Sequence, residues 1–550
     1  MSNVHTVYLV HHSHTDVGYT HDQPILWDLY QRFIDEAVDL TEKYAGSDSD
    51  GAFRWTVENI APLQEWLKNA APEQVERFIA MERAGRIEVT GMFANLTPLY
   101  DADQLLESFQ GIRELRQKYG FNIRYGMNCD VNGENWPLAD ILAGLGIEGF
   151  TMAINIHFGG YPLKRPYAFN WQGPAGGKVM AWNGWTYDTG WRFAIGRDPQ
   201  EFEETWWPRI DAFLDKIDYP LPTLMIQSYH PFGDNGSAFE EFSHFINSWN
   251  EQGKSPRIVL ATPSMWWATV KEHRHLLPTH RGDWTDYWNF GCASSAREQA
   301  INRANRTRLR TADALSAAVL GADGPSTNLW LAKSFGRYRD EAWRNLHLWD
   351  EHTWGADLSI RYPDCEDAAT QWYHKANYAY QARSLSLMLQ RDGLADFARG
   401  VTRSEATDVL LFNPLPWPRQ LSGQSPQGVI SPRGVPQDTT AGRHTQDRIQ
   451  DIDYLVEISK MQNGDLSGGK PPQKLFALPP VEVPGFGYQV VSQDALIDLT
   501  ESLLVSEASV VENGRFRLTF DLEQGGIRSW HDKKIDHEWV DQSTDYSKGD

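Results

Sequence analysis

The sequence predicts a three-part protein: an α/β, barrel-like domain over residues 1–290, a three-helix bundle over 291–401, and a β-rich, sandwich-like region over 402–550. Three observations support this division. Short apolar runs alternate with amphipathic stretches in the first part, helical patterns follow one another without a strand in the second, and short strands separated by turn residues make up the third. A chain of 550 residues is also too long for a single hydrophobic core.

The alternation in the first part is typical of a parallel sheet, either open or closed into a barrel. The predicted strands are 6–11, 53–57, 86–91, 148–154, 178–182, 223–228 and 257–261. The predicted helices between them include 25–43, 73–84, 102–119, 200–215 and 239–252. Because catalytic residues of such folds lie where strands end and loops begin, polar residues directly after these strands are the first candidates for a site.

The second and third parts differ in their hydrophobic periodicity. Helical patterns at 296–320, 337–352 and 366–392 predict the bundle. Beyond them, Val409–Phe412 is a predicted strand closed by a turn, and the Pro/Gly/Ser-rich stretch 414–442 predicts an exposed loop. Further short strands are expected at 454–459, 474–478, 486–491, 515–520 and 526–530. These are fewer strands than a sandwich needs to cover its faces, which suggests a truncated chain.

The charge balance excludes two classes of partner. Lys and Arg number 51 and Asp and Glu 73, so the formal net charge is −22. Nucleic acids and anionic membranes both need a basic face, and we therefore expect neither as a partner. The 23 Trp, 21 Tyr and 24 Phe residues fill large cores and also stack on sugars, so they favour a carbohydrate partner only slightly.

The cysteine spacing and the lengths of the apolar runs bear on where in the cell the protein is located. Cys129, Cys292 and Cys365 are far apart and have no CxxC spacing, which argues against disulfides and a thiolate zinc site. The start of the chain lacks the pattern of a signal peptide, and no run approaches the ~18 apolar residues of a membrane span. We expect a cytoplasmic protein, and a homo-oligomer is compatible with the sequence.

The most informative motif follows the first predicted strand, where His14 and Asp16 stand two residues apart. Side chains at this spacing on a strand point the same way. An imidazole and a carboxylate side by side make half of a divalent metal site. The alternative is a polar strand end with two solvated side chains.

Three further segments place polar residues at predicted element ends. Asp130 follows a strand-like stretch and precedes a Gly/Asn turn, where an aspartate is otherwise a turn or N-cap residue. His230 and Asp234 follow strand 223–228; they suit proton transfer, although Asp-Asn-Gly is also an ordinary turn. His352 ends the second bundle helix, where a histidine complements the helix dipole unless the bundle packs against the strand ends.

Taken in order, these segments resemble glycoside hydrolase family 38, the zinc-dependent α-mannosidases. Residues 12–19 are similar to the family's opening His-Ser-His-Asn-Asp-Pro-Gly-Trp, and 85–91 to the glycine-containing strand before its acidic loop. The stretch 128–147 resembles the nucleophile segment with its following helix, and 411–419 the family's Phe-Asn-Pro-x-x-Trp-x-Arg. The order of barrel, bundle and β region matches as well, so the resemblance covers nearly the whole chain.

The resemblance implies one Zn²⁺ per chain. His14 and Asp16 match two zinc ligands of the family. Asp130 matches the aspartate that is both ligand and nucleophile, and His352 matches the bundle histidine that completes the site.

The resemblance also implies a retaining glycosidase, in which two carboxyl groups about 5–5.5 Å apart act as nucleophile and general acid/base. Asp130 would be the nucleophile, and Asp234 matches the acidic loop that supplies the acid/base. Tyr19 stands where the family has the Trp that floors the sugar site, and His230 and Trp354 are the other expected substrate contacts.

The sequence departs from the family pattern near the expected pocket. Val17 replaces a proline, Asn132 replaces an aromatic residue, and Asp350-Glu351-His352 replaces His-His-Asp. The implied activity is hydrolysis of an α-linked, carbohydrate substrate, with an α-mannosidase-like site and the sugar left open. Two alternatives remain. The first is a metal-dependent carbohydrate deacetylase or another barrel hydrolase, in which metal-bound water attacks. The second is a non-catalytic carbohydrate-binding relative.

Overall fold

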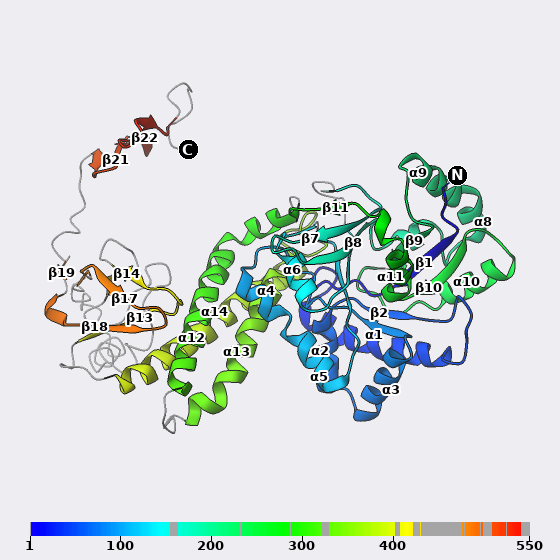
Figure 1. Ribbon diagram of the computed structural model, residues 1–550, viewed down its shortest axis with the longest axis horizontal. Coiled ribbons are helices and arrows are strands. Elements are labelled where there is room, and N and C mark those ends of the chain that lie inside the picture. The colour runs from blue at the N-terminus through cyan, green and yellow to red at the C-terminus, as the bar shows by residue number, and fades with distance from the viewer. Residues whose placement is uncertain are drawn as a thin grey trace. The chain divides into compact units, whose positions relative to one another are not determined.

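The computed structural model divides into two compact units, Met1–Val401 and Thr402–Asp550 (Figure 1). The structure describes residues 2–131, 133–153, 163–231, 233–285, 288–321, 329–401, 408–421, 429–430, 476–477, 479–495, 497–498, 509–523 and 525–540. Among these residues, no helix combines the length and the apolar character needed to cross a membrane.

A buried three-stranded parallel sheet carries the N-terminal strand at its centre. β1 (Thr6–His11) pairs with β9 (Thr223–Ser228) on one side and with β10 (Arg257–Ala261) on the other. Val10 lies opposite Gln227 and Ala261, so the carboxyl ends of all three strands meet at one edge. The predicted bounds of these strands are confirmed because each is a continuous apolar run, the pattern of a strand buried on both faces.

Two further sheets belong to the α/β part, a two-stranded parallel sheet and a five-stranded mixed sheet. β2 (Trp55–Val57) pairs in parallel with β3 (Ile87–Val89), and a bridge from His12 to Thr56 joins this pair to the end of β1. The largest sheet has the order β11-β7-β8-β6-β4. Its strands are β4 (Tyr125–Cys129), β6 (Gly149–Ala153), β7 (Tyr167–Gln172), β8 (Lys178–Gly184) and β11 (Thr279–His280).

The strand–helix alternation of the first part is therefore confirmed, with one irregularity. β7 and β8 form an antiparallel hairpin, which the sequence did not indicate. The short β5 (Gly133–Glu134) pairs antiparallel with β12 (Trp284–Thr285) beside it.

Helices cover these sheets. They are α1 (Gln23–Lys43), α2 (Ile60–Asn69), α3 (Pro72–Arg83), α4 (Ala102–Ser108), α5 (Gln110–Tyr119), α6 (Leu138–Gly144), α7 (Thr189–Arg192), α8 (Pro199–Glu201), α9 (Trp207–Lys216), α10 (Glu241–Glu251) and α11 (Pro263–Glu272). The single helix predicted over 102–119 is two helices, broken at Phe109. Many tryptophans fill the core between helices and sheets, among them Trp66, Trp171, Trp182, Trp249, Trp266 and Trp267. The high tryptophan content is thus largely core filling.

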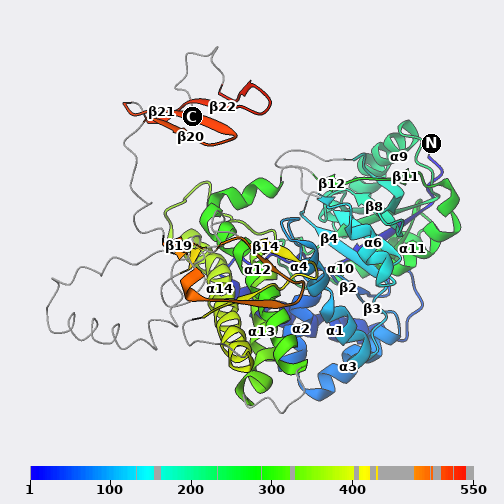
Figure 2. The same cartoon turned by 60° about the vertical axis from the view of Figure 1, so that its left-hand side comes forward.

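The helical middle consists of α12 (Ala296–Gly321), α13 (Leu329–Asp350) and α14 (Glu366–Gly400), which pack side by side (Figures 1 and 2). Leu309, Trp343, Leu346 and Leu389 are among the buried side chains between them. The bundle belongs to the same unit as the α/β part. α13 begins earlier than predicted and ends at Asp350, so His352 lies in the loop beyond the helix rather than in its last turn.

The second unit contains small antiparallel sheets. β13 (Val409–Phe412) pairs with β18 (Tyr488–Val491), and β14 (Arg419–Leu421) with β17 (Val481–Val483). β16 (Phe476–Ala477) pairs with β15 (Val429–Ile430) and with β19 (Ile497–Asp498). The last sheet contains β20 (Val510–Glu512), β21 (Phe516–Asp521), β22 (Gly526–Asp532) and β23 (His537–Glu538). The predicted β character is confirmed, because the described residues of this unit form small antiparallel sheets. Val409, Leu411 and Val491 of one sheet share a buried cluster with Val483 of another. The strand expected at 454–459 lies outside the described residues.

Candidate metal centre

The first pair of candidate ligands lies just past the N-terminal strand. β1 ends at His11, so His14 and Asp16 belong to the following loop and not to one face of the strand as the spacing suggested. Both side chains nevertheless turn into the same buried space, because the loop is held in place by long-range hydrogen bonds. The amide of Asp16 donates to Asn235 Oδ1 (2.9 Å), and the hydroxyl of Tyr30 donates to the carbonyl oxygen of Asp16 (2.6 Å).

The other two candidate ligands come from β4 and from the loop after α13. Asp130 directly follows β4 and has a φ of +61°, a left-handed conformation that is uncommon outside glycine. Its amide donates to the carbonyl oxygen of Ala153 on the neighbouring strand (2.8 Å). The amide of His352 donates to the carbonyl oxygen of Asn95 (2.8 Å), which joins the end of the bundle helix to the α/β part.

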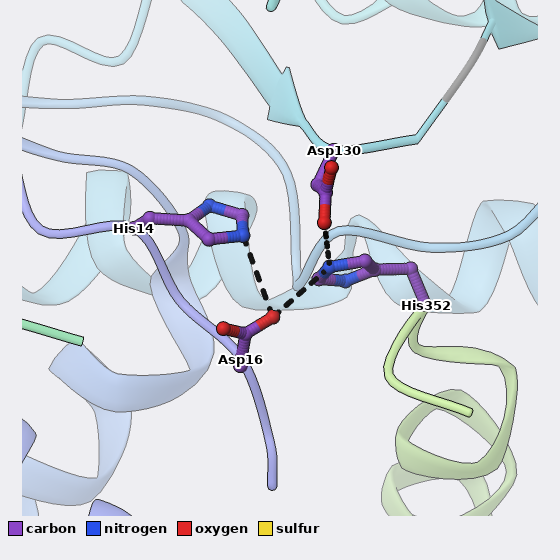
Figure 3. Close-up of side chains that lie close together, drawn as sticks. All are labelled: His14, Asp16, Asp130 and His352. Carbon is purple, nitrogen blue, oxygen red and sulfur yellow. Dashed lines mark ion pairs between the residues drawn. The ribbon is translucent and has the colours of Figure 1, made fainter. Parts of the chain in front are cut away.

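The structure brings these four side chains together (Figure 3). Nε2 of His14 lies 3.4 Å from Asp16 Oδ1, and Nε2 of His352 lies 3.1 Å from the same oxygen and 3.4 Å from Asp130 Oδ2. The four ligand atoms all lie within 4.8 Å of one another. Zinc ligands 2.0–2.1 Å from the metal in a tetrahedron are ~3.3–3.4 Å apart, so the observed spacings of 3.1–3.4 Å fit a single ion.

The cluster also has the polarity of a metal site. All four residues are buried, and within the described part of the chain Nε2 of His14 and Oδ1 of Asp130 have no hydrogen-bond partner. Burial disfavours charge, yet Glu58 and Asp16 together raise the pKa of His14 well above its ordinary value. Burial also lowers the pKa of His352, but Glu351, Asp130 and Asp16 raise it by more, so that it lies well above its ordinary value. The buried carboxylates therefore stabilise positive charge at this position. In the absence of a metal, protons on the two histidines supply that charge, and a bound divalent cation would replace them.

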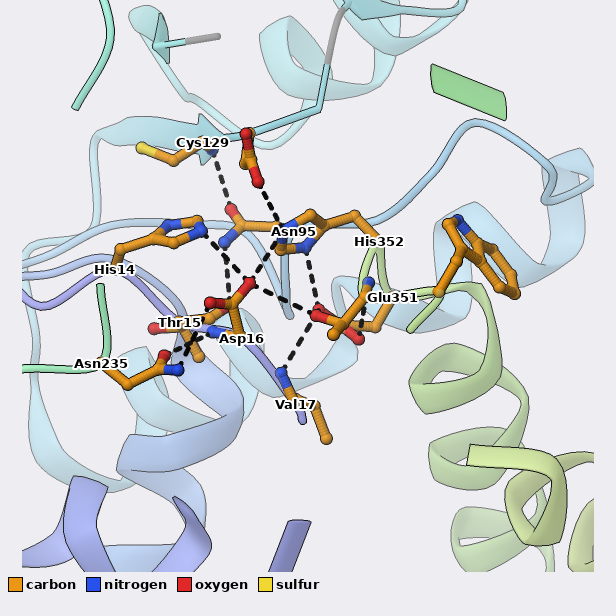
Figure 4. A network of polar contacts seen from close by, with 12 residues as sticks. His14, Thr15, Asp16, Val17, Asn95, Cys129, Asn235, Glu351 and His352 are labelled. Carbon is orange, nitrogen blue, oxygen red and sulfur yellow. Dashed lines mark hydrogen bonds and ion pairs between the residues drawn. The ribbon is translucent and has the colours of Figure 1, made fainter. Parts of the chain in front are cut away.

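Each histidine is oriented by a buried glutamate on its other ring nitrogen, and Figure 4 shows this contact for His352 and Glu351. His14 Nδ1 lies 3.2 Å from Glu58 Oε1, and His352 Nδ1 lies 2.8 Å from Glu351 Oε1. Glu351 is in turn 3.0 Å from the buried ammonium of Lys375. Such carboxylate–histidine contacts turn Nε2 toward the place of a metal and raise its basicity.

Sequence reasoning missed both glutamates as members of the site. Glu58 directly follows a predicted strand, which is the same signal that selected His14, but its role depends on a contact 44 residues away. Asn235 was also missed, although its amide donates to Asp16 Oδ2 (3.3 Å).

A second group of metal-ligating side chains, His12, Glu58 and Cys129, lies beside the first. His12 Nδ1 is only 2.6 Å from Glu58 Oε2. This spacing is much shorter than the ~3.3 Å expected between two zinc ligands and is that of a close ion pair. Burial also raises the pKa of the Cys129 thiol, which disfavours the thiolate that a metal needs.

A pocket of about 1060 Å³ is lined by three of the four cluster residues, Asp16, Asp130 and His352. Tyr19, Asp234 and Trp354 line the same pocket. His230 is not among the lining residues; its ring packs edge-on against Phe239, with 5.2 Å between the centroids. The expected substrate contact of His230 therefore has no support in the arrangement of the pocket.

Aromatic side chains also line the pocket, and one of them, Tyr187, was not singled out by the sequence. Tyr187 stacks on the ring of His14, with centroids 4.1 Å apart and planes 20° apart. Trp354 donates from Nε1 to Thr97 Oγ1 (3.1 Å) and lies against Gly291, where an added Cβ would collide with its ring. Aromatic faces beside buried carboxylates are suited to binding sugars.

Asp234 has the electrostatic environment of a general acid. Burial is the largest cause, and with the nearby charges of Asp16 and Asp130 it raises the pKa of Asp234 to about 6. A carboxyl group with this pKa holds its proton in mildly acidic solution and is suited to proton transfer.

The fold and the cluster define an α/β protein in which four candidate metal ligands meet beside a pocket. The family model "Glycosyl hydrolases family 38 N-terminal domain" matches residues 4–287, more than half of the chain. The chain belongs to glycoside hydrolase family 38. No curated protein sequence matches it significantly.

Solved structures support the same fold. An alpha-mannosidase from Enterococcus faecalis V583 matches with a TM-score of 0.63 and 14% identity over 97% of this chain and 61% of that chain. A family 38 protein from Enterococcus faecalis matches with a TM-score of 0.58 and 14% identity over 98% of this chain and 60% of that chain. This chain therefore spans about three-fifths of the length of these two proteins.

Proposed function

We propose that this protein is a zinc-dependent retaining glycosidase that acts on α-linked sugars, with α-mannosides as the first substrates to test. The observation that carries the proposal is the cluster of His14, Asp16, Asp130 and His352 at the pocket, in a chain of a glycoside hydrolase family. The solved alpha-mannosidase of similar fold supports the choice of sugar.

The four cluster residues would hold the metal. Two imidazoles and two carboxylates at tetrahedral spacing favour zinc over magnesium or calcium, which prefer oxygen ligands in larger number. A zinc ion bound there would bind vicinal hydroxyls of the sugar and favour a distorted ring.

Asp130 and Asp234 divide the chemistry between them. In the first step the Asp130 carboxylate forms a bond to the anomeric carbon, the glycosidic bond breaks, and the proton of Asp234 goes to the leaving oxygen. In the second step Asp234, now a carboxylate, takes a proton from water; the water oxygen bonds to the anomeric carbon, and Asp130 is released. The raised pKa of Asp234 supports its role as acid.

The pocket walls would position the sugar. Tyr19 and Trp354 lie on the lining beside the two carboxylates and offer aromatic faces to a ring. Tyr19 lies in the loop that also carries Asp16 and has a left-handed backbone, with a φ of +71°.

A covalent trap tests the proposal directly. A fluorinated α-mannosyl fluoride, which forms the glycosyl-enzyme quickly and loses it slowly, should add one sugar to the tryptic peptide 125–164, and fragmentation should place it on Asp130. A label on another residue would refute the nucleophile assignment. Release of acetate from acetylated sugars without labelling would indicate a deacetylase, and sugar binding without either reaction would indicate a non-catalytic relative.

A further inference from the structure

Asn95 contacts every segment that carries a candidate metal ligand. It is fully buried and lies between β3 and α4, outside any helix or strand. Neither its position nor its residue type marks it in the sequence as part of a metal site.

The side-chain amide of Asn95 joins two strand ends (Figure 4). Its Oδ1 accepts a hydrogen bond from the amide of Cys129, the residue before Asp130 (2.9 Å). Its Nδ2 donates to the carbonyl oxygen of Thr15, the residue between His14 and Asp16 (3.2 Å). One planar group therefore fixes the spacing between the loop after β1 and the end of β4.

The same nitrogen also supports the orientation of His14. Nδ2 of Asn95 donates to Glu58 Oε1 (2.5 Å), the oxygen that faces His14 Nδ1. An amide suits this place better than a carboxylate, because the neighbouring Glu58 carboxylate and Thr15 carbonyl both need a donor.

The backbone around Asn95 holds the third segment. Its carbonyl oxygen accepts from the amide of His352 (2.8 Å), and the amide of Thr97 donates to the carbonyl oxygen of Asp350 (2.7 Å). Leu96 and Glu351 form an antiparallel bridge between these two bonds. The loop that carries His352 is thus attached to the α/β part through the segment around Asn95.

We propose that Asn95 is a positioning residue of the metal centre: it sets the distances between His14, Asp16, Asp130 and His352 and thereby the affinity and coordination geometry of the bound ion. The proposal rests on the metal site of the proposed function. Such a network holds the ligand side chains in place before the metal binds. Metal binding then costs less conformational entropy, and the affinity is higher.

The experiment measures zinc affinity by competition with a chelator, together with the visible spectrum of the Co²⁺-loaded protein. Asn95→Ala removes all three side-chain hydrogen bonds, and Asn95→Ser keeps a hydroxyl that can replace one of them. Asn305→Ala is the matched control: Asn305 is equally buried, donates to the carbonyl oxygen of Ala379 and accepts from Arg308, and lies in the bundle core away from the cluster.

We expect Asn95→Ala to weaken zinc binding about 10–100-fold, with Asn95→Ser in between and Asn305→Ala unchanged. The Co²⁺ spectrum of the Asn95 variants should lose the intense bands of four-coordinate cobalt, whereas Asn305→Ala should keep them. If Asn95→Ala fails to fold, Asn95→Ser carries the same comparison.

Equal zinc affinity and an unchanged Co²⁺ spectrum in the Asn95 variants would overturn the proposal, as would an equal loss in Asn305→Ala. Failure of the parent protein to bind zinc is a different result, because it refutes the proposed metal site itself.

Discussion

The left-handed backbone of Asp130 has a practical consequence for testing its role. An aspartate at a φ of +61° is tolerated because its short polar side chain can bond locally, and asparagine shares this property. Alanine does not, so Asp130→Ala combines the loss of the carboxylate with backbone strain. The conformation aims the carboxylate at His352 and away from the strand.

Asp130→Asn should therefore abolish turnover while leaving the apo protein within about 1 kcal/mol of the parent in unfolding free energy. Asp130→Ala should be inactive as well and less stable. Denaturant melts of chelated protein compare the two variants. An active Asp130→Asn variant would exclude the nucleophile role.

The pKa of Asp234 predicts the pH dependence of catalysis. Burial raises the pKa of Asp234 above that of an ordinary carboxyl group, and the general acid must be protonated in the free enzyme, so kcat/KM should fall as pH rises through this raised pKa. Asp234→Asn should remove this alkaline limb and slow substrates with poor leaving groups most. A parent profile that stays flat from pH 5 to pH 8 would point to another acid.

The glutamates behind the two histidines should tune metal affinity. Glu58→Gln and Glu351→Gln keep the size of the side chain but remove the charge that orients each ring, and each should weaken zinc binding about 10–100-fold. Glu88→Gln is the control, since Glu88 is also buried but accepts from the amide of Ser264, outside the cluster. Equal effects in all three variants would mean that the loss reflects general damage to the core.

At the scale of elements, the site depends on the junction between the bundle and the α/β part. Arg306 of α12 pairs with Asp350 at the end of α13 (2.7 Å), and both side chains are buried. Gln104 of α4 donates to the same carboxylate (2.8 Å). Asp350 therefore anchors the loop that carries His352 to both parts of the first unit.

Arg306→Leu should destabilise the protein by about 3–5 kcal/mol, because it leaves a buried carboxylate without its cation. Arg32→Leu, which breaks the exposed pair with Asp28, should change stability by less than about 1 kcal/mol. Chemical denaturation of the metal-loaded protein measures both. Similar effects in the two variants would contradict the anchoring role of Asp350.

The elements also show what a sequence can and cannot predict. β1, β9 and β10 were predicted at their observed bounds because continuous apolar runs mark strands that are buried on both faces. The same reasoning selected His14, Asp16, Asp130 and Asp234, each close behind a strand. Glu58 and Asn95 were missed because their role lies in contacts with residues more than 30 positions away, which no local pattern records.

At the scale of the whole molecule, the proposed metal would join segments that are distant in sequence. His14 and Asp16 come from the N-terminal loop, Asp130 from the middle of the α/β part, and His352 from the bundle. An ion that binds only the folded state stabilises it by mass action. The metal should therefore stabilise the first unit as one cooperative body.

Chelation should lower the unfolding temperature of the first unit, and added zinc should restore it. His14→Ala, which lacks a ligand, should unfold at a temperature that chelator does not change. Differential scanning calorimetry with and without chelator makes the comparison. An unchanged melting curve of the parent after verified metal removal would contradict the shared site.

The most direct test of the central claim is the metal content of the purified protein, measured by mass spectrometry of the elements on protein prepared without chelator. The account predicts about one zinc per chain in the parent and in Asn305→Ala, and almost none in His14→Ala or His352→Ala. A parent without metal, or histidine variants that retain a full equivalent, would contradict it.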